Sequence, residues 1–233
     1  MAIQSCKRGA SEDELPEGKR CKPAAAAHQS ALRVHRAVAE RGLLSVSWVE
    51  LPKDWGVVAK LAYGWSGEAY DLKKNACDPF EEELFDASFG INLNISNEGK
   101  KIFEDPLAYR VGVCMGGGQK QGIMVAKVNR PQEKRGRRRP PNVKIEFLAT
   151  RPGNLCRDVE ERFSGVGRSL VEHAKSLARE QRISYVVLMA TSQARGFYER
   201  CGFVPISHVW EKYDVYDLGG GDMATFVEPL TGI

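Results

Sequence analysis

The stretch from Arg162 to Gly167, with the sequence RFSGVG, constrains this chain more than any other segment. It lies between a strand-like segment and an amphipathic helical pattern that runs from Arg168 to Arg182. Gly165 and Gly167 allow a tight turn whose backbone N–H groups converge, and the helix that follows directs the positive end of its dipole at the same point. The sequence therefore predicts an anion-binding turn at the start of a helix.

The segments on either side of this turn predict a β-α-β unit. Residues 143–149 alternate as a half-buried strand does. Its apolar face is expected to carry Val143, Ile145, Phe147 and Ala149. After the turn, apolar residues recur at helical spacing, and the nearly continuous apolar run from Ile183 to Ala190 is typical of a strand buried on both faces.

A second, shorter helix is predicted directly after the buried strand. Thr191 or Ser192 is the expected N-cap, and Gly202 is expected to end the helix. Phe203 then opens another strand. One side of the helix is expected to be apolar, with Ala194, Phe197, Tyr198 and Cys201.

With these residues in place, the chain resembles the GCN5-related N-acetyltransferase (GNAT) superfamily over roughly residues 143 to 205. Arg162, Gly165 and Gly167 match its Q/R-x-x-G-x-G/A signature, which in the superfamily binds the pyrophosphate of acetyl-CoA. The second signature, A-x-x-F-Y-x-x-x-G-F, begins at Ala194. Thr191 stands where many members carry an asparagine that contacts the pantetheine arm. The link from Thr150 to Glu161 is longer than usual, and it either contacts the acceptor substrate or is a surface loop.

The resemblance implies an α/β (α+β) fold and a co-substrate. The fold is a mixed, mostly antiparallel twisted sheet flanked by helices, with the central β-α-β unit binding acetyl-CoA. A backbone N–H near Leu148 or Ala149 would polarise the thioester carbonyl. The residues implied to bind the co-substrate are Leu148, Ala149, Arg162, Phe163, Ser164, Gly165, Val166, Gly167, Arg168 and Thr191.

The implied activity is transfer of an acetyl group to a primary amine by direct attack in a ternary complex. The acceptor is either a protein lysine or N-terminus or a small-molecule amine. Tyr198 is the implied proton donor to the departing thiolate, with core packing as the alternative role. Glu146 is the candidate base for the amine, with an ion pair to Lys144 as the alternative. The competing hypothesis is a non-catalytic module that binds acyl-CoA, nucleic acid or protein.

Composition predicts one domain preceded by a tail. The chain has 233 residues, 42% of them hydrophobic, which suffices for one large core. Residues 1–28 are polar and are expected to be disordered, and the domain is expected to span 29–233. No apolar run approaches the length of about 18 residues that a membrane span needs, and no signal peptide is evident, so a soluble intracellular protein is expected. The cysteines lack metal-ligand spacing, so no metal site is predicted.

Two basic stretches predict partners. The pair Lys7-Arg8 and the cluster from Lys19 to Lys22 resemble a bipartite nuclear import signal, so an import carrier and the nucleus are suspected, with a solvated tail and the cytoplasm as the alternative. The run 134–139, KRGRRR, would attract phosphates or nucleic acid weakly and without base stacking, or is an exposed loop without a partner. The oligomeric state is not predicted.

The remaining elements follow from shorter patterns. Three consecutive glycines, Gly116 to Gly118, are interpreted as a hairpin turn and not as a phosphate site, because a strand and not a helix follows them. Asp78 is the expected cap of an acidic helix. Helices are predicted at 55–70 and 79–89, with some helical spacing at 30–39, and strands at 44–51, 109–114, 122–128, 209–216 and 223–227.

Overall fold

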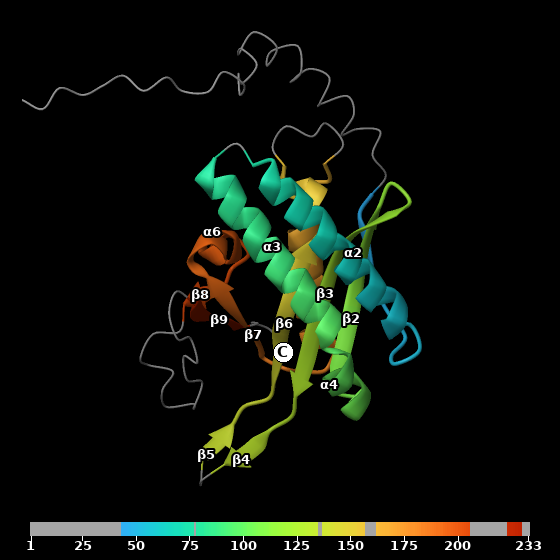
Figure 1. Ribbon diagram of the computed structural model, residues 1–233. Coiled ribbons are helices and arrows are strands. Elements are labelled where there is room, and N and C mark those ends of the chain that lie inside the picture. Colours follow the sequence, from blue (N-terminus) through green and yellow to red (C-terminus); the bar gives the residue numbers. More distant parts are fainter. Residues whose placement is uncertain (1–42, 77, 135–136, 157–161, 206–222, 230–233) are drawn as a thin grey trace, which may run out of the picture. The chain divides into compact units, whose positions relative to one another are not determined.

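The computed structural model describes residues 43–76, 78–134, 137–156, 162–205 and 223–229 (Figure 1). The strands are β1 (Ser45–Trp48), β2 (Tyr109–Gly116), β3 (Gln119–Asn129), β4 (Gln132–Lys134), β5 (Arg137–Arg139), β6 (Asn142–Thr150), β7 (Tyr185–Thr191), β8 (Val204–Pro205) and β9 (Met223–Pro229). The helices are α2 (Trp55–Lys74), α3 (Pro79–Asn97), α4 (Gly99–Glu104), α5 (Val166–Glu180) and α6 (Ser192–Arg200), with a short 3-10 helix at Pro152–Leu155.

Several predictions from the sequence fall outside the described residues. They are the two basic clusters of the import signal, the helical spacing at 30–39 and the strand at 209–216. The boundary between a tail and a domain at residue 28 stays a prediction for the same reason.

Within the described residues, seven strands form one mixed sheet in the order β1-β2-β3-β6-β7-β9-β8. β6 and β7 are parallel neighbours, and the other neighbouring strands of this sheet are antiparallel. The helix α5 connects the parallel pair, so β6, α5 and β7 are the predicted β-α-β unit. The mixed, mostly antiparallel sheet flanked by helices is confirmed.

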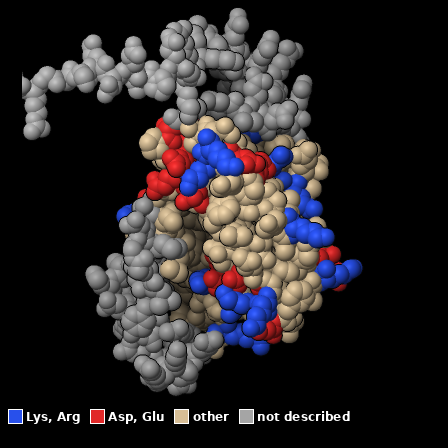
Figure 2. Space-filling view, in the orientation of Figure 1, with Lys and Arg blue, Asp and Glu red and all other residues tan. Residues whose placement is uncertain are grey.

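The helices cover both faces of the sheet, because the central strands are apolar on both sides. In β3, Ile123 and Val125 pack on the α2 and α3 side, whereas Met124 and Ala126 pack on the α5 side. Figure 2 views the face with α2 and α3, whose middle is largely uncharged and whose rim carries basic and acidic side chains together. None of the described helices combines the length and the apolar character that a membrane span requires.

A bulge in β6 corrects the prediction that Val143, Ile145, Phe147 and Ala149 share one face. Ala126 pairs with Ile145 but its neighbour Val125 pairs with Phe147, so Glu146 is an extra residue in the ladder. An extra residue reverses the alternation of faces beyond it. Val143 and Ile145 therefore pack on the α5 side, and Phe147 and Ala149 on the α2 and α3 side.

A capping residue explains where α3 begins, and two glycines explain the turn between β2 and β3. The Asp78 carboxylate accepts a hydrogen bond from Glu81 N–H at 2.8 Å, which confirms the predicted cap of α3. Gly117 and Gly118 have φ angles of 57° and 75° and form the β2–β3 turn, so the hairpin interpretation is also confirmed. Both long helices extend beyond their predicted ends, and α4 was not predicted.

The basic run that was expected to be an exposed loop contains strand pairing instead. β4 and β5 pair antiparallel and form a ribbon separate from the main sheet. Pro131 on one side and Pro140 with Pro141 on the other lack the N–H groups that would continue the ladder of β3 and β6.

Candidate functional site

The turn before α5 has backbone N–H groups without an acceptor among the described residues. Gly165 has φ of 82° and is the N-cap of α5, a left-handed conformation that favours glycine. Arg162, Ser164, Gly165 and Arg168 are exposed. Within the described residues, the N–H groups of Val166, Gly167 and Arg168 have no hydrogen-bond acceptor. A helix start with such N–H groups is suited to bind an anion.

Two close contacts fix this helix start in place. A β-carbon on Gly122 of β3 would lie 2.5 Å from Val166 Cγ1, so β3 approaches the first turn of α5 directly. A β-carbon on Gly167 would lie 3.0 Å from Phe197 Cζ of α6 and 3.7 Å from Leu148 Cδ2. The side chain of Val166 is buried, so Val166 contributes to the site through its backbone, while Gly167 lets α5 approach α6.

The strands β6 and β7 separate beside this helix start. Their parallel pairing covers Val143 to Ile145 and ends at the bulge, although both strands continue beyond it. Leu148 and Ala149 lie on the part of β6 that is paired with β3 but not with β7, and Thr191 is the last residue of β7 and the N-cap of α6. The unpaired edge of a strand can take up an extended ligand as an additional strand.

The link after β6 is anchored on α2 and β3. Arg151 Nε lies 3.4 Å from Glu68 Oε1, and Gly153 N–H donates a hydrogen bond of 3.1 Å to the same oxygen. Asn154 Nδ2 donates to Gln121 Oε1 at 3.1 Å. The described part of the link, up to residue 156, is therefore held by polar contacts and contains the 3-10 helix.

Asn154 also fixes the beginning of the turn. Its Oδ1 accepts a hydrogen bond of 2.9 Å from Phe163 N–H. The Phe163 ring lies over the β2–β3 hairpin, where a β-carbon on Gly116 would come within 2.7 Å of it and one on Gly117 within 2.8 Å. Phe163 was predicted to bind the co-substrate; in the structure its N–H group is occupied by Asn154.

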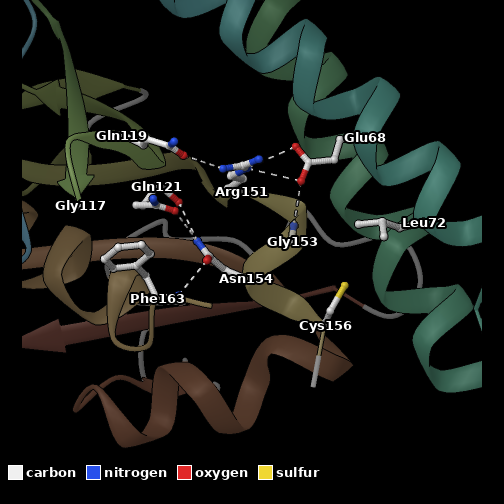
Figure 3. A pocket seen from close by; sticks show the side chains of 10 residues that line it. All are labelled: Glu68, Leu72, Gly117, Gln119, Gln121, Arg151, Gly153, Asn154, Cys156 and Phe163. Carbon is white, nitrogen blue, oxygen red and sulfur yellow. Dashed lines mark hydrogen bonds and ion pairs between the residues drawn. The ribbon is translucent and has the colours of Figure 1, made fainter. Parts of the chain in front are cut away.

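A pocket of about 490 Å³ lies next to the turn, between α2, the β2–β3 hairpin and the link. Its lining includes Glu68 and Leu72 of α2, Gln119 and Gln121 of β3, and Phe163 (Figure 3). Figure 3 shows Arg151 between Gln119 and Glu68, to which it donates hydrogen bonds, with Asn154 beside Gln121. The pocket is lined by side-chain amides and by a matched ion pair, so it has no strong charge of one sign.

Tyr198 is buried between α6 and the sheet. Its side chain is 8% exposed, and its ring contacts those of Phe197 and Phe203 edge-to-face, with centroids 4.9 and 5.9 Å apart. Burial raises the pKa of Tyr198 to about 12, because the phenolate form would lose its hydration. Tyr198 is therefore protonated throughout the physiological pH range and has a packing role in any case.

Glu146 lies at the bulge and is paired with its neighbour on the same strand. Glu146 Oε2 is 2.8 Å from Lys144 Nζ, and the two side chains are 23% and 31% exposed. The ion pair with Lys144, which was the alternative role predicted for Glu146, is therefore present. Glu146 also directly follows Ile145, the last residue of β6 that pairs with β7.

One protein-family model matches part of the chain. Residues 119–205 match the family model described as an acetyltransferase (GNAT) domain. The match runs from β3 to β8. It therefore includes the bulged strand β6, the start of α5 and Tyr198. Over residues 119–205 the chain is therefore similar to GNAT acetyltransferase domains.

Solved structures with a similar arrangement are acetyltransferases. The PaiA N-acetyltransferase of Thermoplasma acidophilum, in complex with coenzyme A, is 14% identical with a TM-score of 0.45 over 79% of this chain and 99% of that chain. An acetyltransferase of Thermus thermophilus is 16% identical with a TM-score of 0.48 over 81% and 98%. Among curated proteins, none is significantly similar to this chain in sequence. The likeness to the GNAT family in sequence covers residues 119–205.

The structure adds residues to the site that the sequence did not indicate. Asn154, Gln121, Glu68 and Arg151 meet only because α2, β3 and the link after β6 come together in the fold. Glu68 and Gln121 are far in the chain from the link that carries Arg151 and Asn154, and the four residues belong to no motif. Among the described residues, no group of three or more histidine, cysteine, aspartate or glutamate side chains is placed to hold a metal ion.

Proposed function

We propose that this chain is an acetyl-CoA-dependent N-acetyltransferase that transfers the acetyl group to a primary amine by direct attack in a ternary complex. The observation that carries the proposal is the coincidence, inside the region that matches the GNAT family model, of an exposed helix start and a separated pair of parallel strands. The first suits a diphosphate, and the second suits an extended arm. Acetyl-CoA contains both groups in one molecule.

The residues at the helix start have the chemistry to hold the diphosphate. The N–H groups of Val166, Gly167 and Arg168 can donate hydrogen bonds to phosphate oxygens, and the exposed Arg168 adds a cation. Gly165 keeps the approach free of a side chain. The pantetheine arm would extend along Leu148 and Ala149, with Thr191 across the gap.

The reaction requires one bond to form and one to break. The amine nitrogen attacks the thioester carbonyl, the new C–N bond forms, the C–S bond breaks, and the proton lost by nitrogen finally resides on the coenzyme A sulfur. A preorganised backbone N–H near Leu148 or Ala149 would stabilise the developing oxyanion, an effect that is worth about 3 kcal/mol in a well-studied protease.

Tyr198 fits the role of hydrogen-bond donor to the departing sulfur. Its pKa of about 12 keeps the hydroxyl protonated, which is the form that a donor needs. A tyrosine with this pKa is a much weaker acid than a thiol, whose ordinary pKa is about 8.5. We therefore assign it stabilisation of the thiolate by a hydrogen bond, while the proton balance is closed by the proton that the amine releases.

Glu146 is the proposed acceptor of the amine proton. Its support is its place at the bulge, directly after the last residue of β6 that pairs with β7. Its ion pair with Lys144 competes with this role, and a water molecule between carboxylate and amine would allow both. The acceptor is either a protein amine or a small amine.

The experiment that tests the proposal is a calorimetric titration of acetyl-CoA into the wild-type protein and into Ser164→Asp. Ser164 is exposed, so the variant adds a negative charge at the helix start without a buried contact to disturb. The matched control is Ser184→Asp, which adds the same charge at an exposed position beyond the other end of α5. We expect saturable binding in the wild type and the control and loss of at least tenfold in affinity in Ser164→Asp. Absence of wild-type binding would refute the proposal.

A further inference from the structure

A lysine is buried on the apolar stripe of α5. The side chain of Lys175 is only 6% exposed. The other buried residues of this helix are all apolar: Val166, Leu170, Val171, Ala174, Leu177 and Ala178. Lysine is almost never fully buried in a protein unless its charge is paired. The position of Lys175 in the core therefore requires an explanation that packing alone does not give.

The side chain of Lys175 joins α5 to the end of α6. Lys175 Nζ donates a hydrogen bond of 2.6 Å to the carbonyl oxygen of Cys201, which is the C-cap of α6. A cation is favourable there, because the carbonyl groups at the end of a helix carry partial negative charge. Lys175 Nζ also lies 2.9 Å from Glu172 Oε1, but the side chain of Glu172 is half exposed. The buried contact of Lys175 is thus the one with α6.

Cys201 and Phe203 connect this contact to Tyr198. The carbonyl oxygen of Tyr198 accepts hydrogen bonds from Cys201 N–H at 2.9 Å and from Phe203 N–H at 3.1 Å. Lys175 Nζ lies 5.8 Å from the centroid of the Phe203 ring, and that ring lies 5.9 Å from the Tyr198 ring. The lysine therefore reaches Tyr198 by two routes, through the backbone after α6 and through the ring of Phe203.

The helix that carries Tyr198 depends on contacts with the rest of the fold. α6 has nine residues, and its N-cap Thr191 makes no capping hydrogen bond through its side chain among the described residues. A helix of this length is only marginally stable by itself in water. Figure 1 shows α6 beside β8 and β9 at the side of the sheet away from α2. The bond from Lys175 holds the end of α6 at which Tyr198 lies.

Lys175 affects Tyr198 through geometry and not through charge. Burial, and after it the Cys201 side chain, raises the pKa of Tyr198, and Lys175 is not among the causes of that shift. Buried ion pairs can often be replaced by apolar side chains of similar volume without loss of stability. A buried lysine is therefore better explained here by the geometry that it imposes than by the stability that it provides.

We propose that Lys175 is a positioning residue for acetyl transfer: through the carbonyl of Cys201 it holds the last turn of α6, so that the Tyr198 hydroxyl meets the departing sulfur of coenzyme A. This inference rests on the proposed function. A displacement of about 1 Å at a catalytic group can lower a rate about a hundredfold. Lys175 lies in the second half of α5, away from the helix start at Val166, so it acts on the rate and not on acetyl-CoA binding.

The test compares Lys175→Met with Glu172→Gln. Methionine fills a similar volume but cannot donate to Cys201, whereas Glu172→Gln removes the ion pair and keeps that hydrogen bond. Calorimetry measures acetyl-CoA affinity, and thiol release at saturation measures the rate, with spermidine and poly-L-lysine as the acceptors. We expect Lys175→Met to lower the saturated rate about tenfold, with acetyl-CoA affinity within about twofold of the wild type. Glu172→Gln should keep the wild-type rate.

The same substitution in the Tyr198→Phe background separates positioning from a merely structural role. If Lys175 acts through the Tyr198 hydroxyl, Lys175→Met should change the rate of Tyr198→Phe less than about twofold, because the group that it positions is gone. A structural role would lower the rate by the same factor in both backgrounds. Lys175→Gln, which keeps a polar group in place of the lysine, should show the same pattern, and it serves if Lys175→Met does not fold. Thermal unfolding verifies folding of each variant.

Three results would overturn the inference. They are a wild-type rate in Lys175→Met, a loss of acetyl-CoA affinity in place of a loss of rate, or equal losses of rate with and without the Tyr198 hydroxyl. A wild-type protein that acetylates neither acceptor would overturn the proposed function, and this inference with it. A wild-type rate in Lys175→Met, in contrast, would overturn this inference alone.

Discussion

The Phe163 ring and the backbone of Gly116 are in contact: a β-carbon at residue 116 would lie 2.7 Å from Phe163 Cδ1. Such a distance is far shorter than a normal carbon–carbon contact of about 3.5 to 4.0 Å. The β2–β3 hairpin thus supports the turn that precedes α5. A side chain at residue 116 would therefore displace Phe163 and disturb the turn before α5.

We expect Gly116→Ala to weaken acetyl-CoA binding and to lower stability. The added methyl group must displace Phe163 or Leu44, and overpacking of this kind costs about 1 to 3 kcal/mol. Gly64→Ala in α2 is the control, because a β-carbon there would have open space and alanine favours the helix. Urea unfolding and calorimetry measure the two effects. If Gly116→Ala behaved like Gly64→Ala, the hairpin would have no role in supporting the turn.

Asn154→Ala should weaken acetyl-CoA binding without changing the rate of acetyl transfer at saturation. The variant removes the acceptor of Phe163 N–H and the donor to Gln121, and a lost hydrogen bond of this kind costs about 1 kcal/mol, or about fivefold in affinity. Asn94→Ala, at an exposed position of α3, is the control. A fall in the saturated rate with unchanged affinity would contradict a positioning role for Asn154.

Tyr198→Phe should reduce the saturated rate of thiol release by about tenfold or more while leaving acetyl-CoA affinity nearly unchanged, because only the hydrogen bond to sulfur is removed. Tyr63→Phe, at a tyrosine that is 67% exposed on α2, is the matched control. Full activity in Tyr198→Phe would leave Tyr198 with its packing role alone. If the wild type bound acetyl-CoA but showed no turnover with any amine, the binding-module hypothesis would gain support.

The raised pKa of Tyr198 predicts a loss of stability at alkaline pH. The folded-state pKa of about 12 lies above the value of 10.0 for an unperturbed tyrosine, so the folded state holds its proton longer. Its contribution to stability is complete below pH 10 and is lost as the pH rises toward 12, by up to about 3 kcal/mol. Urea unfolding of the wild type and of Tyr198→Phe over this range measures the difference. The free energy of unfolding of the wild type should fall relative to that of Tyr198→Phe as the pH rises from 10 toward 12. A constant difference between the two proteins would contradict the raised pKa.

Glu146→Gln should lower the saturated rate at least tenfold if its carboxylate accepts the amine proton, whereas Lys144→Met should not lower it. Both variants break the same ion pair of 2.8 Å, so each is the structural control of the other. The measurement is the rate of acetyl transfer as a function of pH. An equal loss in both variants would mean that the pair is structural and that another group, or water, accepts the proton.

The sequence was sufficient for the features that depend on neighbouring residues. Gly165 adopts the left-handed conformation expected of a glycine that opens a helix, and Asp78 caps α3 through the N–H three residues later. The apolar run of β7 is buried on both faces as its composition predicts. These features follow from local sterics, hydrogen bonds and hydrophobic periodicity, and the motif around Gly165 and Gly167 was enough to indicate the similarity to GNAT acetyltransferases that the family match over residues 119–205 also finds.

Features that depend on the alignment of distant strands could not be predicted. The alternation in β6 was predicted to continue without interruption, but Glu146 is an extra residue because the register against β3 shifts there. A single inserted residue cannot be recognised in the alternation of one strand until the partner strand is known. The basic run at 134–139 was likewise expected to be a loop, and the pairing of β4 with β5 became visible only in the fold.

The sequence by itself determined where the candidate site lies: a glycine turn that opens a helix between two strands of a β-α-β unit. The tertiary structure decided how the site is held. Asn154 and Gly116 support Phe163, Glu68 holds Arg151, and the bulge at Glu146 marks the point where β6 leaves β7. The physical reason is that turns and caps are stabilised by bonds between near neighbours, whereas these contacts join segments that only the packing of the sheet and its helices brings together.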